Sequence, residues 1–207
     1  MAIGDPMPPG VSVVNGPGGP TDKPSYSIQR GANVGRFARD ILQRQFYRKF
    51  SILASVRPDQ LGSGYIFSLM DLPRHSKIVL GVRLIDSPPF SIIRLEVLNV
   101  HYRMNHMVNF TVPRFAGQWR QFAFSVTERE IIFYFQCVKY QTFQLQNSLL
   151  GMFVRSTTAI YLGRSGWRED SEDTAFGVSS TRKRTVIFKT ADFYYLKRCL
   201  FKGWRLM

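Results

Sequence analysis

The chain has 207 residues, of which 44% are hydrophobic and 14% aromatic, so it can build one compact core and is not a disordered protein. No apolar run approaches the roughly 18 residues that a bilayer requires, which excludes a membrane span. The net charge of +14 predicts a surface that attracts polyanions, whether nucleic acid, anionic lipid or sulfated glycan.

The first 24 residues are rich in Pro and Gly and predict a flexible lead-in, because they offer too little apolar surface to offset the entropy of ordering them. The segment MAIGDPMPPG lacks the basic start and continuous apolar stretch of a secretory signal. Two interpretations follow: either the start is missing from this chain, or the protein stays inside the cell.

After residue 24, short stretches with two-residue alternation follow one another and are separated by turn residues. This pattern predicts an all-β fold, an antiparallel two-sheet sandwich. One short helix is expected at Val34–Arg44, where Phe37, Ile41 and Leu42 have helical spacing. The polar residues 163–184 predict a long surface loop, and residues 201–207 form a tail of uncertain order.

The chain has two cysteines, Cys137 inside the apolar, strand-like run IIFYFQCVKY and Cys199 near the end. One interpretation is a disulfide that ties the end of the chain to its core, in an oxidising compartment. The other is a free cysteine that packs as a small hydrophobic residue. Spacing alone does not choose between them.

The order of several motifs resembles the thrombospondin N-terminal-like domain, a laminin-G-like sandwich of the concanavalin-like jelly-roll type. The motifs are KFSILASVRP, GYIFSLMD, IVLGVRL, FTVPRFAGQWRQFAFSV and IIFYFQC. The segments YSIQRGANVGRFAR, FYRKFSILASVRP and VPRFAGQW look most like the version at the front of the multiplexin collagens, types XV and XVIII. The resemblance covers roughly residues 25–163 and then thins; it implies one domain over residues 25–200.

The resemblance also bears on the cysteines. In this family the cysteine that matches Cys137 bonds to one after the last strand, a place that Cys199 fits. The chain departs from the family pattern with Gln136 in place of an Asp and Thr190 in place of a Gly. These departures weaken the prediction of a Cys137–Cys199 bridge, but they do not affect the core motifs.

Enzyme and metal motifs are absent from the sequence, so we expect no catalytic activity and no metal cofactor. Solvated side chains explain the three histidines best, although His101 and His106 near Glu96 are an alternative metal site. The acids of residues 169–173 offer oxygen ligands of the kind that calcium uses, and some laminin-G-type domains bind calcium. A solvated loop is the favoured interpretation of this run.

The basic residues support a more specific hypothesis, the binding of a sulfated polyanion, because guanidinium groups form paired, charge-assisted hydrogen bonds with sulfate. The resemblance implies heparin or heparan sulfate as the polyanion. The alternative is a set of surface charges that only keep the protein in solution. The candidate binding residues are Arg36, Arg39, Arg44, Arg48, Lys49, Arg182, Lys183 and Arg184.

Asn109 begins the sequence Asn-Phe-Thr, an acceptor for N-linked glycosylation in a secreted chain. Strand alternation allows Asn109 to face outward while Phe110 and Val112 face the core.

The resemblance implies a non-catalytic, secreted module of the extracellular matrix and basement membrane. Such a module binds heparan sulfate and other matrix proteins, and forms a homotrimer if collagen repeats follow it. A lectin-like or carbohydrate-processing sandwich protein, with calcium as a conceivable ligand, is the alternative. An intracellular nucleic-acid binder fits the charge but lacks the residues of a recognised module, so no nucleic-acid partner is expected.

Overall fold

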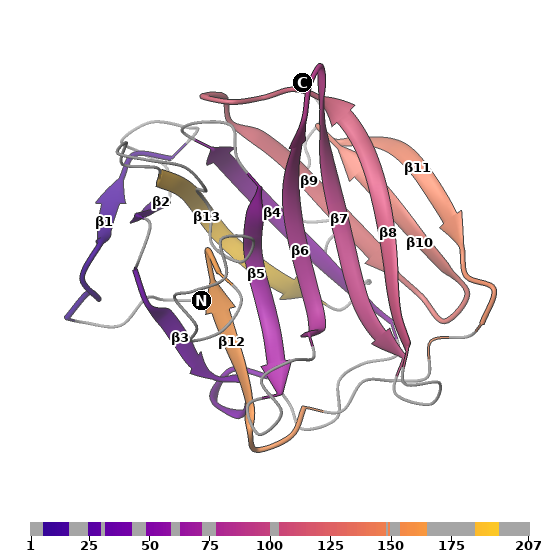
Figure 1. The fold of residues 1–207 in the computed structure, drawn as a ribbon, viewed down its shortest axis with the longest axis horizontal. Coiled ribbons are helices and arrows are strands. Elements are labelled where there is room, and N and C mark those ends of the chain that lie inside the picture. The colour runs from indigo at the N-terminus through magenta and orange to yellow at the C-terminus, as the bar shows by residue number, and fades with distance from the viewer. Residues whose placement is uncertain are drawn as a thin grey trace.

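The computed structural model describes residues 6–16, 25–29, 32–42, 49–58, 63–71, 78–99, 104–147, 149, 154–164 and 185–194. Two antiparallel sheets pack face to face (Figure 1). This confirms the predicted all-β sandwich. In the described part of the chain, no helix is long and apolar enough to cross a membrane.

The larger sheet has seven strands in the order β1-β2-β13-β4-β9-β10-β11. Their bounds are β1 Val11–Val14, β2 Ser25–Gln29, β13 Thr185–Tyr194, β4 Phe50–Pro58, β9 Arg120–Val126, β10 Glu130–Phe135 and β11 Val138–Gln144. The smaller sheet has six strands in the order β3-β12-β5-β6-β7-β8. Their bounds are β3 Val34–Phe37, β12 Thr158–Leu162, β5 Gly64–Asp71, β6 Ile78–Ser87, β7 Phe90–Asn99 and β8 Met104–Pro113.

Alternate residues of each sheet meet in a shared apolar core. Phe110 of the smaller sheet stacks on Phe133 of the larger sheet, with ring centroids 4.6 Å apart, and lies 5.6 Å from the ring of Phe124. All three side chains are fully buried. Because aromatic rings bury large areas and prefer offset or tilted contacts, this cluster fixes how the two sheets sit on each other.

The prediction of a helix at Val34–Arg44 is wrong. Among the described residues of this segment, 34–42, residues 34–37 form β3, which pairs with β12, and Ala38–Asp40 form a single turn of 3-10 helix. Of the three residues with helical spacing, Phe37 and Ile41 are 43% and 37% exposed, whereas Leu42 packs against the core. Pairing with the edge of the smaller sheet satisfies the backbone groups of this segment and overrides the helical spacing of its side chains.

The two edge strands of the larger sheet, β1 and β11, were not among the expected strands. β1 lies inside the segment predicted as a flexible lead-in, where the β-branched residues of VSVV pair with β2. β11 forms the outermost strand of the larger sheet, and nearly all of its residues are exposed. Both are edge strands, which bury little and therefore carry a weak hydrophobic pattern.

Two substitutions in β8 test which face of the strand carries the core. Phe110→Ala should lower the free energy of unfolding by about 3–5 kcal/mol, because it opens a cavity between the sheets. Met107→Ala, at a side chain that is 59% exposed on the same strand, should change it by less than about 0.5 kcal/mol. Denaturant titration of both variants measures the difference, and equal losses would contradict the register of β8.

Candidate functional site

The outer face of the smaller sheet carries a row of polar side chains across four strands. Tyr65 pairs with Arg83, Arg83 with Arg94, and Arg94 with Asn109, so all four residues point to the same side. Two positions along β7, Glu96 lies on this side as well and is only 5% exposed. We call Tyr65, Arg83, Arg94 and Glu96 the outer-face cluster.

Hydrogen bonds and ring contacts order this cluster. The Tyr65 hydroxyl lies 3.0 Å from both carboxylate oxygens of Glu96 and donates its proton to them. The Arg83 guanidinium lies over the Tyr65 ring, 5.5 Å from its centroid. The carboxylate of Glu96 offsets the repulsion between Arg83 and Arg94, which lie directly opposite each other.

Two glycines make room for tyrosine rings on this face. A side chain at Gly81 would approach the Tyr65 ring to 3.1 Å, and one at Gly35 would approach the Tyr161 ring to 2.6 Å. Gly81 also pairs with Glu96 across the strands, so the ring that lies over Gly81 brings its hydroxyl to the carboxylate. The sequence analysis did not find this arrangement, because it depends on strand register.

Burial raises the pKa of Tyr65 well above its usual value, and the neighbouring carboxylate of Glu96 raises it further. The two arginines of the cluster act in the opposite direction but do not reverse the shift. Tyr65 therefore remains a neutral hydrogen-bond donor at physiological pH.

Three of the predicted polyanion-binding residues lie in the described part of the chain, and all three are exposed: Arg36, Arg39 and Lys49. Arg36 is on β3 and Arg39 is in the 3-10 helix that follows, so both belong to one segment at the edge of the smaller sheet. The guanidinium of Arg39 lies 5.0 Å from the centroid of the Phe37 ring and has Asp40 within 3.7 Å. Lys49 instead precedes β4 of the other sheet. Arg44, Arg48, Arg182, Lys183 and Arg184 lie outside the described residues.

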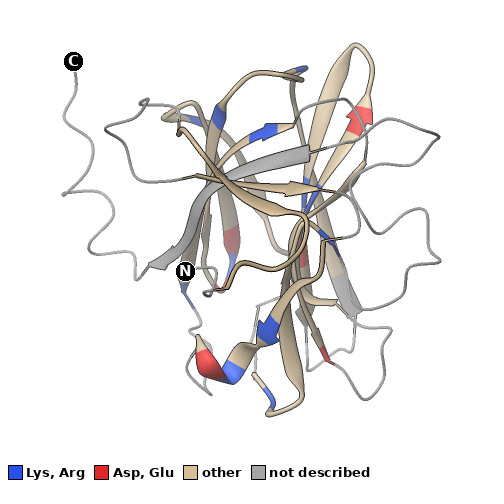
Figure 2. Ribbon diagram, turned by 90° about the vertical axis from the view of Figure 1, so that its left-hand side faces the viewer, with Lys and Arg blue, Asp and Glu red and all other residues tan. Residues whose placement is uncertain are grey.

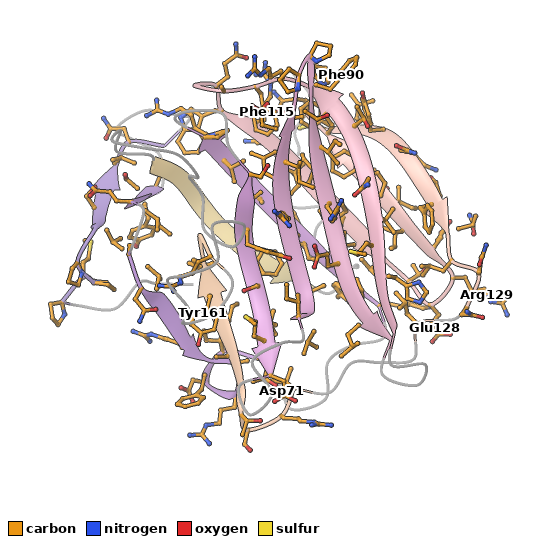
Figure 3. All side chains as sticks on the ribbon, in the orientation of Figure 1. Asp71, Phe90, Phe115, Glu128, Arg129 and Tyr161 are labelled. Atoms are coloured by element: carbon orange, nitrogen blue, oxygen red, sulfur yellow. The ribbon has the colours of Figure 1, made fainter. Side chains whose placement is uncertain are left out.

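Basic and acidic residues are spread over several strands of the sandwich (Figure 2). Asp71, Glu128 and Arg129 lie at the opposite end of the molecule from Phe90 and Phe115 (Figure 3). At the Asp71 end, Arg155 forms an ion pair of 3.1 Å with this carboxylate. Charge at that end is therefore partly neutralised.

The end marked by Phe115 holds a group that the sequence analysis did not select, the Trp119 cluster of Arg57, Trp119 and Arg120. The guanidinium of Arg57 lies over the Trp119 ring, 5.7 Å from its centroid. Arg120 donates to the Trp119 carbonyl oxygen at 3.1 Å and to the side-chain oxygen of Gln118. In the described ranges, no carboxylate pairs with either arginine.

The apolar run around Cys137 predicted that this residue lies in a buried strand, and that prediction is wrong. The cysteine is exposed in the two-residue turn between β10 and β11, where Gln136 and Cys137 have φ values of 49° and 68°. A tight hairpin of this kind requires left-handed backbone at both central positions, whatever the hydrophobicity of the flanking residues. Partial desolvation raises the pKa of the thiol. Cys137 is unbridged in the structure and Cys199 lies outside the described residues, so their bridge stays a prediction.

The alternative metal site is not assembled around Glu96. This residue pairs with Met107 on the outer face, whereas His106 pairs with Val97, which faces the core. Glu96 and His106 therefore lie on opposite sides of the sheet. Among the described residues, no group of three or more potential ligands could hold a metal ion. His101 and the acids of residues 169–173 lie outside the described ranges.

Comparison with known proteins supports the predicted resemblance. No protein-family model matches the chain. The human collagen alpha-1(XVIII) chain is 28% identical to it over 170 residues, which is 79% of this chain. The chain resembles a multiplexin collagen. It spans only 9% of the length of collagen XVIII, so the similarity concerns one module of that long protein.

Solved structures confirm the jelly-roll fold. An endo-β-1,4-glucuronan lyase from the fungus Trichoderma reesei superposes with a TM-score of 0.56 at 11% identity, covering 88% of this chain and 86% of the lyase. The binding domain of botulinum neurotoxin serotype C1 superposes with a TM-score of 0.52 at 13% identity, covering 89% of this chain and 43% of that one. At these identities, the similarity shows the fold alone.

The Tyr65–Glu96 contact predicts a pH dependence of stability. Folding raises the pKa of Tyr65. The contribution of Tyr65 to the free energy of unfolding is therefore fully present below pH ~10, the pKa of an unfolded tyrosine, and declines as the pH rises further. Tyr65→Phe should lower the free energy of unfolding by about 1–3 kcal/mol at neutral pH, because Glu96 loses its hydrogen-bond donor. The variant should also show a flatter decline of this free energy above pH ~10.

Urea titrations from pH 7 to 11 measure this effect. Tyr134→Phe, at a half-buried position on β10 of the other sheet, is the matched control. The same slope above pH 10 in wild type and Tyr65→Phe would contradict the coupling.

Proposed function

We propose that this chain is a non-catalytic, secreted module of the extracellular matrix that binds heparan sulfate or heparin through exposed arginines. The similarity to collagen XVIII supports the matrix setting. The net charge of +14 supports a polyanionic ligand, because a positive field raises its association rate and its affinity. By the same similarity, we propose basement membrane as the location, other matrix proteins as partners and a homotrimer where collagen repeats follow.

The observation that carries the proposal is the Trp119 cluster. Arg57 lies over the Trp119 indole, and Arg120 donates to the Trp119 carbonyl oxygen and to Gln118; neither guanidinium forms an ion pair in the described part of the chain. A sulfate group can accept paired hydrogen bonds from such a guanidinium. The half-buried indole offers an apolar surface beside it for a sugar ring. Arg36 on β3 and Arg39 in the following 3-10 helix are two further exposed arginines.

The alternative function is carbohydrate processing, since the glucuronan lyase shares the fold. Its candidate site in this chain is the outer-face cluster. The cluster does not fit a general base. Tyr65 holds its proton because its pKa is raised, and Glu96 is buried and already accepts that proton in a hydrogen bond. The geometry therefore favours binding over catalysis.

Heparin-affinity chromatography of three variants tests the proposal. Arg57→Ser/Arg120→Ser and Arg36→Ser/Arg39→Ser should each elute at clearly lower salt than the wild type, which should be retained above physiological ionic strength, about 0.15 M. The control Arg129→Ser/Arg155→Ser removes the same number of charges at the end of the sandwich where acids lie nearby. It should elute close to the wild type.

Equal shifts of the elution salt in all three variants would show that the protein binds heparin by nonspecific ion exchange. That result would contradict the proposed binding sites. A wild type that elutes below physiological ionic strength would remove heparan sulfate as the ligand.

We also propose the bridge between Cys137 and Cys199, which the family resemblance implies. The secreted, non-reduced protein should contain no titratable thiol. Cys199→Ser should release one thiol that reacts without denaturant, because Cys137 is exposed in its hairpin turn. Two reactive thiols in the native wild type would exclude the bridge and would favour a reducing compartment.

A further inference from the structure

The glycosylation sequence lies in the middle of a free sheet edge. β8 is the last strand in the order of the smaller sheet, and among the described strands only β7 pairs with it. Asn109 and Thr111 are exposed on one side of β8, and Phe110 between them is fully buried on the other. Both side chains that an oligosaccharyl transferase recognises therefore face solvent. No other Asn-X-Ser/Thr sequence occurs in the chain.

A hydrogen bond holds the acceptor side chain in one orientation. Nε of Arg94 donates to Oδ1 of Asn109 at 2.8 Å, and the two residues lie directly opposite each other on β7 and β8. Because arginine can only donate, this contact assigns the carbonyl oxygen of the amide to Arg94. Nδ2, the atom that carries a sugar in an N-linked glycan, therefore points away from Arg94. The bond also survives glycosylation, which leaves Oδ1 unchanged.

The edge of β8 lacks the usual protection against pairing with another chain. Free edges are commonly shielded by charged side chains, by proline or by short length. β8 has ten residues, contains no Asp, Glu, Lys or Arg, and carries its single proline at the last position. Beside Asn109 on the same side, Met107 is 59% exposed. The other described edges are shorter, since β1 and β3 have four residues each and β11 has seven, with Lys139 among them.

We propose that Asn109 carries an N-linked glycan that shields the free edge of β8 and keeps the module from pairing with itself. In this reaction, Nδ2 forms a bond to the anomeric carbon of the first sugar. The bond between that carbon and the diphosphate of a polyprenyl-linked oligosaccharide breaks, and the amide nitrogen gives up one proton. The attached sugars are hydrophilic and bulky, so they cover Met107 and block the approach of a second strand. The proposal rests on the secretion inferred under the proposed function.

Two substitutions at Thr111 separate the glycan from the side chain. Thr111→Val removes the acceptor sequence but keeps a β-branched residue on the strand and leaves the Arg94–Asn109 bond in place. Thr111→Ser keeps the acceptor sequence and is the matched control. Each protein is secreted from animal cells behind a supplied signal peptide and measured by intact mass before and after an amidase that removes N-linked glycans.

Wild type and Thr111→Ser should lose mass after the amidase, and Thr111→Val should not. Light scattering should show a concentration-dependent increase in size for Thr111→Val and for native wild type after enzymatic removal of the glycan, but not for glycosylated wild type. The enzymatic arm starts from secreted, folded wild type and changes only the Asn109 amide, to the carboxylate of an aspartate, so it remains decisive if Thr111→Val folds poorly.

A secreted wild type without a glycan at Asn109 would overturn the proposal. So would deglycosylated protein that keeps the size of the glycosylated form at all concentrations. Heparin retention of the same samples separates this proposal from the proposed function. Loss of retention with an intact glycan contradicts only the heparan sulfate site.

Discussion

The contact between Phe110 and Phe133 is the constraint on which the other features of the sandwich depend. It joins an edge strand of the smaller sheet to the larger sheet, and both rings are fully buried. Because side chains alternate along a strand, burying Phe110 commits Asn109 and Thr111 to the outer side of β8. A shift of one residue would send the glycosylation sequence into the core. Core packing thus decides which residues a ligand or a modifying enzyme can reach.

Cross-strand pairing builds the outer-face cluster in the same way. Arg83 and Arg94 face each other because β6 and β7 pair in one register, and the glycine at position 81 admits the ring of Tyr65. Glu96 is thereby placed under the tyrosine hydroxyl, where it offsets two positive charges. The outcome is a hydrogen-bonded polar network on a sheet face, which is costly to disturb because Tyr65 and Glu96 are buried. We assign this network a structural role, and the binding role to arginines outside it.

Ion pairs occur at both ends of the sandwich, but not every arginine takes part in one. At one end, the carboxylate of Asp71 meets Arg155. At the other, Arg114 pairs with Asp86, whereas Arg57 lies over the Trp119 indole, Arg120 bonds to the Trp119 carbonyl oxygen, and neither meets a carboxylate in the described ranges. A sulfated chain that binds to Arg57 and Arg120 displaces no ion pair between them and the other described residues. The total charge of the chain could not reveal this difference, because it counts paired and unpaired arginines alike.

The sequence by itself determined the fold class, since two-residue alternation with frequent turns specifies stacked antiparallel sheets, and its motifs correctly indicated the resemblance to multiplexin collagens. Its alternation also allowed Asn109 to face outward and Phe110 to face the core, which is the arrangement in the structure. Only the tertiary structure decided the fate of Val34–Phe37, where pairing with β12 replaces the expected helix. It likewise placed Cys137 in an exposed turn and assembled the Trp119 cluster. These features depend on which strands become neighbours and in what register, and such long-range contacts leave no local pattern in the chain.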